Sequence, residues 1–295
     1  MPSFTILAAR GVLEIPGEDR VAFLQGLTSN DVEQVAPDRV VFSTFLTPQG
    51  KYLHDFFIAA RGDTLLLDCE AGRRDDLMRR LRLYRLRSKV DLRDLTDDFT
   101  VAVVMGDDAA STVPLPAADF GRATVFGGGI AYVDPRMAEL GIRLLLPRAD
   151  AEATLSGTGA EPANENDYDR LRLALGVPDG SRDLIVEKST LLESDYDTLN
   201  AISWDKGCYL GQELTARMKY RGLVKKRLMP VTVDGPLPPP GTPITLEGRE
   251  VGEMRSGSGA SGIALLRLDA VGRAGPDASL SADGAVIVPR GPSAT

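Results

Sequence analysis

Residues 205–217 read DKGCYLGQELTAR and carry the densest set of reactive side chains in the sequence. They are Lys206, Cys208, Tyr209, Gln212, Glu213 and Arg217, with two glycines between them. A cysteine that precedes a helix and lies two residues from a lysine is in positive potential, which favours the thiolate. Gln212 and Glu213 offer donors and acceptors to the edge of a heteroaromatic ring. Considered alone, the residues favour a buried cysteine at a helix N-terminus, because free cysteine is among the most buried residue types.

The stretch also resembles a family signature, K-G-C-[FY]-x-G-Q-E, of the YgfZ family. These are folate-binding relatives of the glycine-cleavage T protein (aminomethyltransferase) that act in assembly or repair of iron–sulfur clusters. Residues 214–217 (LTAR) resemble the mitochondrial branch in particular. Further matches follow the family's order, at residues 26–31, 50–55, 173–178 and 193–195. The resemblance implies an aminomethyltransferase-like α+β fold, with two lobes and a small C-terminal β-barrel around a central channel that binds tetrahydrofolate.

The resemblance also implies roles for individual residues. Cys208 would be the reactive centre, with Lys206 beside it. Tetrahydrofolate, or a derivative of it, would be held by Asp55, Glu193, Tyr209, Gln212, Glu213 and Arg217. With two cysteines, one histidine and no CxxC pair, the chain is not expected to bind a metal stably by itself. Cys208 would therefore act on iron–sulfur client or carrier proteins transiently, sharing cluster ligation with the partner or with glutathione.

Two departures from the transferase pattern bear on the reaction. His54 stands beside Asp55 where the T protein has two adjacent carboxylates, and Ala174 replaces a glutamate of the second lobe. These losses argue against a classical aminomethyltransferase, so whether the chain is an enzyme stays open. A folate-dependent one-carbon transferase and a folate-binding protein of tRNA modification remain alternatives. Strand alternation puts His54 and Asp55 on opposite faces, and we expect His54 to be merely solvated.

Hydrophobic patterning predicts an α+β chain in two regions. The first covers residues 1–223, which the resemblance implies to be the folate-binding region of two intertwined lobes, and the second covers residues 224–295, whose short, regularly spaced strands predict a β-barrel. In the first region we expect strands at 40–46, 52–60 and 64–69 and at 101–105, 123–126 and 142–146, with helices at 18–30, 72–89, 166–175 and 211–219. In the second we expect strands at 228–233, 244–246, 250–255, 262–268 and 285–288. Cys69 ends an apolar strand and is expected to be packing.

Charge and length set the remaining limits. The 295 residues carry a net charge of −8, which argues against bulk binding to nucleic acid or anionic membrane. The segment from Arg73 to Arg93 is nevertheless strongly basic and keeps a tRNA contact open. Six basic residues and no acid lie between Thr215 and Val233, and this run suits a polyanionic ligand or partner. No apolar stretch is long enough to cross a membrane, no secretory signal is recognised, and we expect a cytoplasmic protein.

Overall fold

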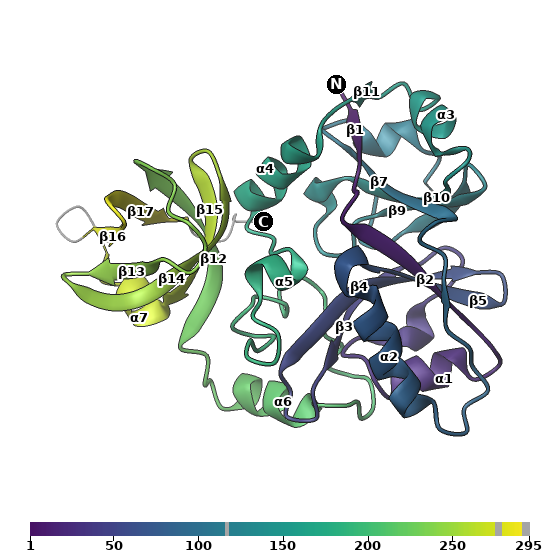
Figure 1. Cartoon of the computed structure of the whole chain (residues 1–295), viewed down its shortest axis with the longest axis horizontal. Coiled ribbons are helices and arrows are strands. Elements are labelled where there is room, and N and C mark those ends of the chain that lie inside the picture. The colour runs from purple at the N-terminus through teal and green to yellow at the C-terminus, as the bar shows by residue number, and fades with distance from the viewer. Residues whose placement is uncertain (116–117, 275–278, 291–295) are drawn as a thin grey trace. The chain divides into compact units, whose positions relative to one another are not determined.

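The chain forms two compact units that alternate along the sequence (Figure 1). The computed structural model describes residues 1–115, 118–274 and 279–290. Unit 1 consists of Met1–Leu46, Leu53–Tyr168 and Thr198–Leu210, and unit 2 consists of Thr47–Tyr52, Asp169–Asp197 and Gly211–Thr295. The predicted boundary between residues 223 and 224 stays a prediction. Residues 275–278 and 291–295 of the predicted barrel region lie outside the described residues.

Unit 1 is built on two sheets. The six-stranded sheet has the order β11-β1-β7-β10-β9-β8 and is antiparallel except where β1 pairs with β11. Its strands are β1 (Ser3–Ile6), β7 (Phe99–Met105), β8 (Ala123–Phe126), β9 (Gly129–Val133), β10 (Ile142–Pro147) and β11 (Glu161–Pro162). The five-stranded sheet has the order β3-β4-β5-β2-β6. Its strands are β2 (Arg10–Pro16), β3 (Val41–Leu46), β4 (Tyr52–Arg61), β5 (Thr64–Glu70) and β6 (Arg93–Asp94).

Short helices connect and cover these strands. They are α1 (Arg20–Gln25), α2 (Arg74–Arg85) and α3 (Ala151–Ser156), with single 3₁₀ turns at Val32–Gln34, Ala71–Arg73, Ala109–Thr112 and Ala138–Leu140. The buried face of α2 carries Leu77, Met78 and Leu81, whose spacing matches the period of a helix. The ring of Tyr84 on α2 meets Phe45 of β3 edge-on at 5.9 Å. Helix α2 therefore covers the β3–β4 side of the five-stranded sheet.

A buried network of charges joins the two sheets of unit 1. Asp68 of β5 is completely buried and is bound by Arg10 of β2 and by Arg143 of β10, each at 2.6 Å. The guanidinium group of Arg143 also lies over the ring of Phe57, 4.2 Å from its centre. Burial raises the pKa of Asp68, but the two arginines outweigh that effect and hold it below its usual value. The carboxylate therefore stays ionised between the sheets.

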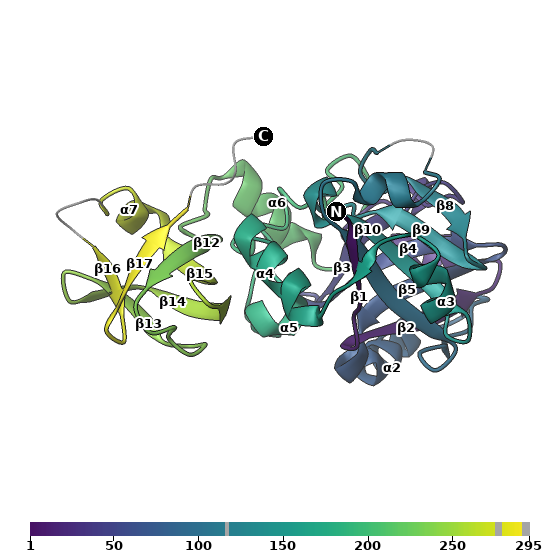
Figure 2. The same ribbon diagram turned by 90° about the horizontal axis from the view of Figure 1, so that it is seen from above.

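Unit 2 contains a closed six-stranded barrel, with the strand order β12-β15-β14-β13-β16-β17 (Figure 2). Its strands are β12 (Lys226–Asp234), β13 (Pro243–Leu246), β14 (Arg249–Ser258), β15 (Ser261–Arg267), β16 (Leu280–Ala282) and β17 (Ala285–Pro289), and helix α7 covers Leu268–Val271. Alternate residues such as Val231, Val233, Ile244 and Leu246 fill its core. The remaining helices are α4 (Glu165–Leu175), which begins in unit 1, α5 (Gly180–Asp183) and α6 (Gln212–Tyr220).

The turn between β3 and β4 belongs to unit 2 and contacts the start of α6. Gly50 has φ +77°, and a Cβ atom placed on it would lie 2.6 Å from the carbonyl oxygen of Gly211. A side chain is therefore excluded at Gly50 by both backbone conformation and space. Beyond the turn, the amide of Tyr52 donates to the carbonyl of Ser189 at 3.0 Å. The family-like residues 50–55 thus begin in one unit and end in the other.

The α+β class, the hairpin and the closed barrel are confirmed. Six strands were not predicted from the sequence: β1, β2, β6, β9, β11 and β16. The first helix, expected at 18–30, ends at Gln25, because the polar residues after it turn back to bind other backbone segments. The helix expected at 72–89 stops at Arg85, where Leu86 takes φ 43°. None of the helices in the described ranges is long and apolar enough to span a bilayer.

Candidate functional site

Lys206 is held by three backbone carbonyl groups. Its Nζ donates to the carbonyl oxygens of Gln25 at 2.9 Å, Thr28 at 2.7 Å and Asn30 at 2.6 Å. Gln25 ends α1, and carbonyl groups at a helix C-terminus lack partners within the helix. A cation there satisfies them and interacts favourably with the helix dipole. The ammonium group therefore uses its three protons to fasten the motif loop to the end of α1.

The same loop has two further attachments. The backbone amide of Leu210 donates to the carbonyl of Gly26 at 3.0 Å, and the amide of Lys206 donates to Oγ of Ser203 at 3.2 Å. Cys208 lies between these attachments and is exposed to solvent. The loop thus presents the thiol outward from a segment that is fixed on both sides of it.

Burial and neighbouring charges act in opposite directions on Lys206. Burial lowers the pKa of Lys206 to about 8, while the carboxylates of Asp31 and Glu33 favour the charged form. The side chain is still mostly an ammonium ion at neutral pH. The ring of Tyr209 lies with its centre 5.3 Å from Nζ, a distance typical of a cation–π contact. Tyr209 is therefore placed beside Lys206.

The turn that receives Lys206 is itself tightly bonded. Oγ of Ser29 donates to the carbonyl of Ala201 at 2.6 Å and accepts from the amide of Thr44 at 3.0 Å. Nδ2 of Asn30 donates to the carbonyls of Phe42 and Asn200, at 2.8 and 2.7 Å. Sequence reasoning used residues 26–31 only as a resemblance and missed this role. The available signal was a run of small polar residues directly after a short helix.

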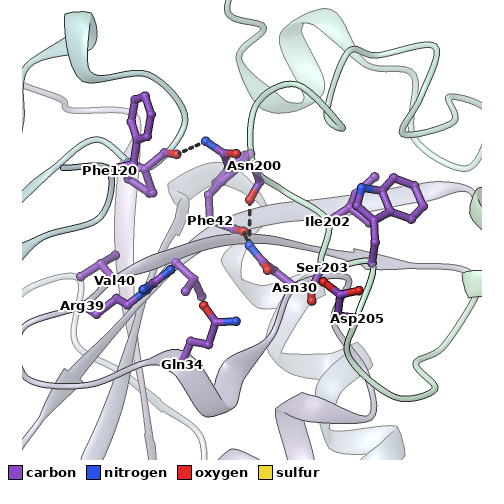
Figure 3. A pocket seen from close by; sticks show the side chains of 13 residues that line it. Asn30, Gln34, Arg39, Val40, Phe42, Phe120, Asn200, Ile202, Ser203 and Asp205 are labelled. Atoms are coloured by element: carbon purple, nitrogen blue, oxygen red, sulfur yellow. Dashed lines mark hydrogen bonds between the residues drawn. The ribbon is translucent and has the colours of Figure 1, made fainter.

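A cavity of about 350 Å³ in unit 1 begins where the motif begins (Figure 3). Asp205, the residue before Lys206, is part of its wall, as are Asn30 and Asn200. The other lining residues are Gln34, Arg39, Val40, Val41, Phe42, Phe120, Pro135, Ile202, Ser203 and Trp204. The hydrogen bonds of Asn30 described above cross one side of it, and they join the β3 segment to the segment that leads to Cys208.

The two cysteines have opposite environments. Cys69 on β5 is 1% exposed, and burial raises the pKa of its thiol to about 12. Its expected role in packing is confirmed. Cys208 is exposed on the loop, so the interpretation of a buried cysteine, drawn from the residues alone, is wrong. No group of three or more His, Cys, Asp and Glu side chains in the described ranges is arranged to hold a metal ion.

His54 is not solvated, contrary to expectation. It is 3% exposed, and its Nε2 lies 3.0 Å from Oδ2 of Asp76 on α2. Burial, together with the charges of Arg73 and Arg80, lowers the pKa of His54 to about 4, against the opposing effect of Asp76. Asp55 is also buried, at 5% exposure. The expectation failed because it assumed a sheet with one open face, whereas both faces of β4 are covered.

Asp76 anchors several of the basic side chains of α2. It is bound by Arg80 at 2.8 Å and also by Arg79. Burial raises its pKa, but hydrogen bonds from Arg80, Arg79 and His54 outweigh this and lower it to about 2. Arg74 binds Asp94 at 2.6 Å. Part of the charge between Arg73 and Arg93 is thus neutralised within the chain, and a tRNA contact there stays a prediction.

The remaining predicted folate residues lie in unit 2. Gln212, Glu213 and Arg217 are on α6, where Glu213 and Arg217 are exposed and one helical turn apart. Glu193 lies in the turn-rich segment before residue 198, and its carboxylate accepts from Oγ1 of Thr190 at 2.8 Å. The structure thus groups Lys206, Cys208 and Tyr209 in unit 1, and Gln212, Glu213 and Arg217 in unit 2. Asp55 and Glu193 lie apart from these groups along the chain, in units 1 and 2.

The fold and its two recognisable parts define a class of protein. Residues 8–122 match the GCVT N-terminal domain, and residues 225–295 match the C-terminal β-barrel domain of CAF17. The aminomethyltransferase T of the glycine cleavage system from Bartonella henselae has a similar structure, with a TM-score of 0.79, covering 98% of this chain and 84% of that one. At 15% identity this likeness shows the fold alone. The chain therefore has the aminomethyltransferase-like fold with a CAF17-type barrel.

Curated relatives narrow this class to one family. The mitochondrial iron–sulfur cluster assembly factor IBA57 of Mus musculus is 32% identical over 286 residues, covering 90% of this chain and 77% of the relative. The protein of the same name from Homo sapiens is 33% identical, covering 88% and 76%. The chain belongs to this family of iron–sulfur cluster assembly factors. The resemblance recognised in the sequence is confirmed at that level.

The expected cytoplasmic location is contradicted by these relatives, whose names place them in mitochondria. The expectation failed because the lack of a membrane-spanning stretch and of a recognised secretory signal does not distinguish the cytoplasm from the interior of a mitochondrion.

Proposed function

We propose that this chain assists the assembly, insertion or repair of iron–sulfur clusters in client enzymes, with Cys208 as the group that meets the cluster and tetrahydrofolate as a bound ligand. The observation that carries the proposal is the exposed thiol of Cys208 on a loop fastened by Lys206 and Leu210. Membership of the assembly-factor family supports the process, and the loop geometry supports the residue.

The position of Cys208 suits transient contact with a cluster that another protein holds. Clusters are generally held by four ligands, and one thiolate supplies one of them. The remaining ligands would then come from a carrier or client protein, or from glutathione. An outward-facing thiol is accessible to such a partner, whereas Cys69 is enclosed in β5. Because the loop is fixed on both sides of the cysteine, little entropy is lost when the partner docks.

The residues available for tetrahydrofolate fit it in kind. Its ring offers amino and amide groups, which a carboxylate recognises, and Asp55 in unit 1 and Glu193 in unit 2 are each a candidate for that contact. Tyr209 offers an aromatic face, and Gln212, Glu213 and Arg217 offer polar groups on α6, with Arg217 suited to a carboxylate of the tail. Tetrahydrofolate carries one-carbon units on its ring nitrogens, and that is the chemistry it would supply when bound.

Complementation tests the proposed role of Cys208. In cells that lack their own homologue, the wild-type chain should restore the activity of iron–sulfur enzymes and Cys208→Ser should not. Cys69→Ala is the matched control, because it removes the other thiol, and it should restore activity as the wild type does. Titration calorimetry with tetrahydrofolate tests the ligand separately.

Full restoration by Cys208→Ser would contradict the role of the thiol. Absence of tetrahydrofolate binding by the purified chain would contradict the ligand. Turnover of methylene-tetrahydrofolate by the purified chain would instead identify a one-carbon transferase.

A further inference from the structure

A second cavity, of about 250 Å³, lies in unit 2 and holds a buried arginine with one unused edge. Arg255 on β14 has a side chain only 9% exposed, and its Nη1 donates to Glu253 at 2.6 Å. Its Nε is enclosed and has no hydrogen-bond partner, and within the described ranges Nη2 has none either. Nε and Nη2 form the edge of a guanidinium group that binds two oxygens of a carboxylate or phosphate side by side. Leaving the buried Nε unpaired is costly unless an acceptor completes it.

The surroundings of this edge are rich in cations. Lys188 and Lys226 line the same cavity, and both are exposed. Neither ammonium group forms an ion pair with a described residue. Hydroxyl groups of Ser189, Thr190 and Ser194 also line it. This combination of a guanidinium edge, ammonium groups and hydroxyls is what a small oxyanion requires.

The acidic residues of the cavity are largely engaged by the protein. Asp183 is bound by Arg172 at 2.8 Å and accepts from the amide of Ser256 at 2.9 Å. Glu253 is bound by Arg255, and Glu193 accepts the hydroxyl proton of Thr190. Among the described residues, Glu193 is thus the one carboxylate of this cavity without a bound cation. Its single negative charge is outweighed by the ammonium groups of Lys188 and Lys226. The net charge that a ligand would meet in the cavity is therefore positive.

We propose that this cavity binds a small-molecule oxyanion, a carboxylate or a phosphate, on the Nε–Nη2 edge of Arg255, with Lys188 and Lys226 supplying additional positive charge. At about 250 Å³ the cavity is smaller than the roughly 300–1,000 Å³ of sites for larger ligands, so a small anion suits it. Glu193, which the proposed function assigns to tetrahydrofolate, also lines this cavity, but the inference goes beyond that function because it requires neither Cys208 nor a folate.

Calorimetric titration of the full chain tests it, with inorganic phosphate in one series and glutarate in another. We expect saturable binding of at least one of them. The anion that binds with the higher affinity shows whether the cavity is a phosphate site or a carboxylate site. Arg255→Gln should weaken binding about tenfold or more, because a charge-assisted pair is lost. Lys188→Gln and Lys226→Gln affect exposed side chains, so these variants test the site even if Arg255→Gln fails to fold. Each of these two lysine variants should bind the anion more weakly than the wild type does, and its anion affinity should depend less on the salt concentration.

Lys225→Gln is the matched control, because it removes the same charge one residue from Lys226 without touching this cavity. It should bind the anion as the wild type does. Absence of saturable binding of both anions at millimolar concentration would overturn the proposal, and so would an equal loss in Lys225→Gln and Lys226→Gln. Cys208→Ser should keep the wild-type anion affinity, so failure here and failure of the proposed function are seen separately.

Discussion

The ammonium group of Lys206 can act in two ways: it fastens the motif loop through hydrogen bonds, and its charge can act on the Cys208 thiol. The two roles predict different effects of replacing it. If the ammonium group mainly fastens the loop, Lys206→Met should lower the free energy of unfolding by about 1–2 kcal/mol, since hydrogen bonds to a charged group are lost from three carbonyls. The rate of Cys208 alkylation at neutral pH should then equal that of the wild type. Urea denaturation measures the free energy of unfolding, and the reaction with iodoacetamide measures the alkylation rate.

Cys208→Ser is the matched control for stability, because its side chain is exposed and it should unfold at the wild-type urea concentration. Slower alkylation of Cys208 in Lys206→Met, with stability intact, would instead show that Lys206 acts on the thiol through its charge.

At the scale of elements, the contact between β4 and α2 makes the fold sensitive to mild acid. The pKa of His54 is about 4 in the folded chain and 6.5 in an unfolded one, so between these values only the unfolded chain takes up the proton. The free energy of unfolding should therefore fall as the pH drops from 6.5 to 4, by roughly 3 kcal/mol in total. Above pH 6.5 this contribution is constant. Denaturation at pH 7.5, 6, 5 and 4.5 measures the slope.

The chain has a single histidine, which makes this test clean. His54→Gln should remove most of the slope in that range, because the group that titrates is gone. Nuclear magnetic resonance gives a direct check: the imidazole signal of the folded chain should not shift between pH 7.5 and 5. A midpoint near 6.5 would show that His54 is not held neutral by the strand and helix around it.

At the scale of the whole molecule, Asp68 ties one sheet of unit 1 to the other. Asp68→Asn removes the buried negative charge that Arg10 and Arg143 both bind. Breaking a buried ion pair in this way costs about 3–5 kcal/mol, so the variant should unfold at much lower urea concentration. Asp269→Asn is the control, because Asp269 pairs with arginines at the surface, and it should unfold as the wild type does. Equal behaviour of the two variants would contradict the role of Asp68.

Much of the fold can be predicted from local sequence patterns. The charge network around Asp68 is an example of what such patterns cannot predict. The β3–β4 hairpin and the barrel strands have turn residues and alternating polar and apolar residues within short windows, so the sequence predicts them. Arg10 and Arg143 lie on strands and read as solvated charges, although both bind a buried carboxylate. Their partner is distant in the sequence, and only the packing of two sheets brings it near.

The candidate site shows the same division. Cys208 and its neighbours form a contiguous motif, which sequence comparison detects. The acceptors of Lys206 are backbone carbonyls at Gln25, Thr28 and Asn30, so no side-chain type marks them. The burial of His54 also could not be read from strand alternation, because the period of two tells which residues share a face and not what covers that face.

The alternation of the two units along the chain has a consequence for synthesis on the ribosome. Unit 1 needs residues up to Leu210, and unit 2 combines Thr47–Tyr52 and Asp169–Asp197 with residues from Gly211 onward. Domains generally fold as units while the chain emerges, but unit 1 cannot close until its last segment, Thr198–Leu210, has left the exit tunnel. That segment contains Lys206 and Cys208. The thiol therefore reaches its place only when the rest of unit 1 has already been made, so a chain that has emerged only to a point before Leu210 does not present it on a finished surface.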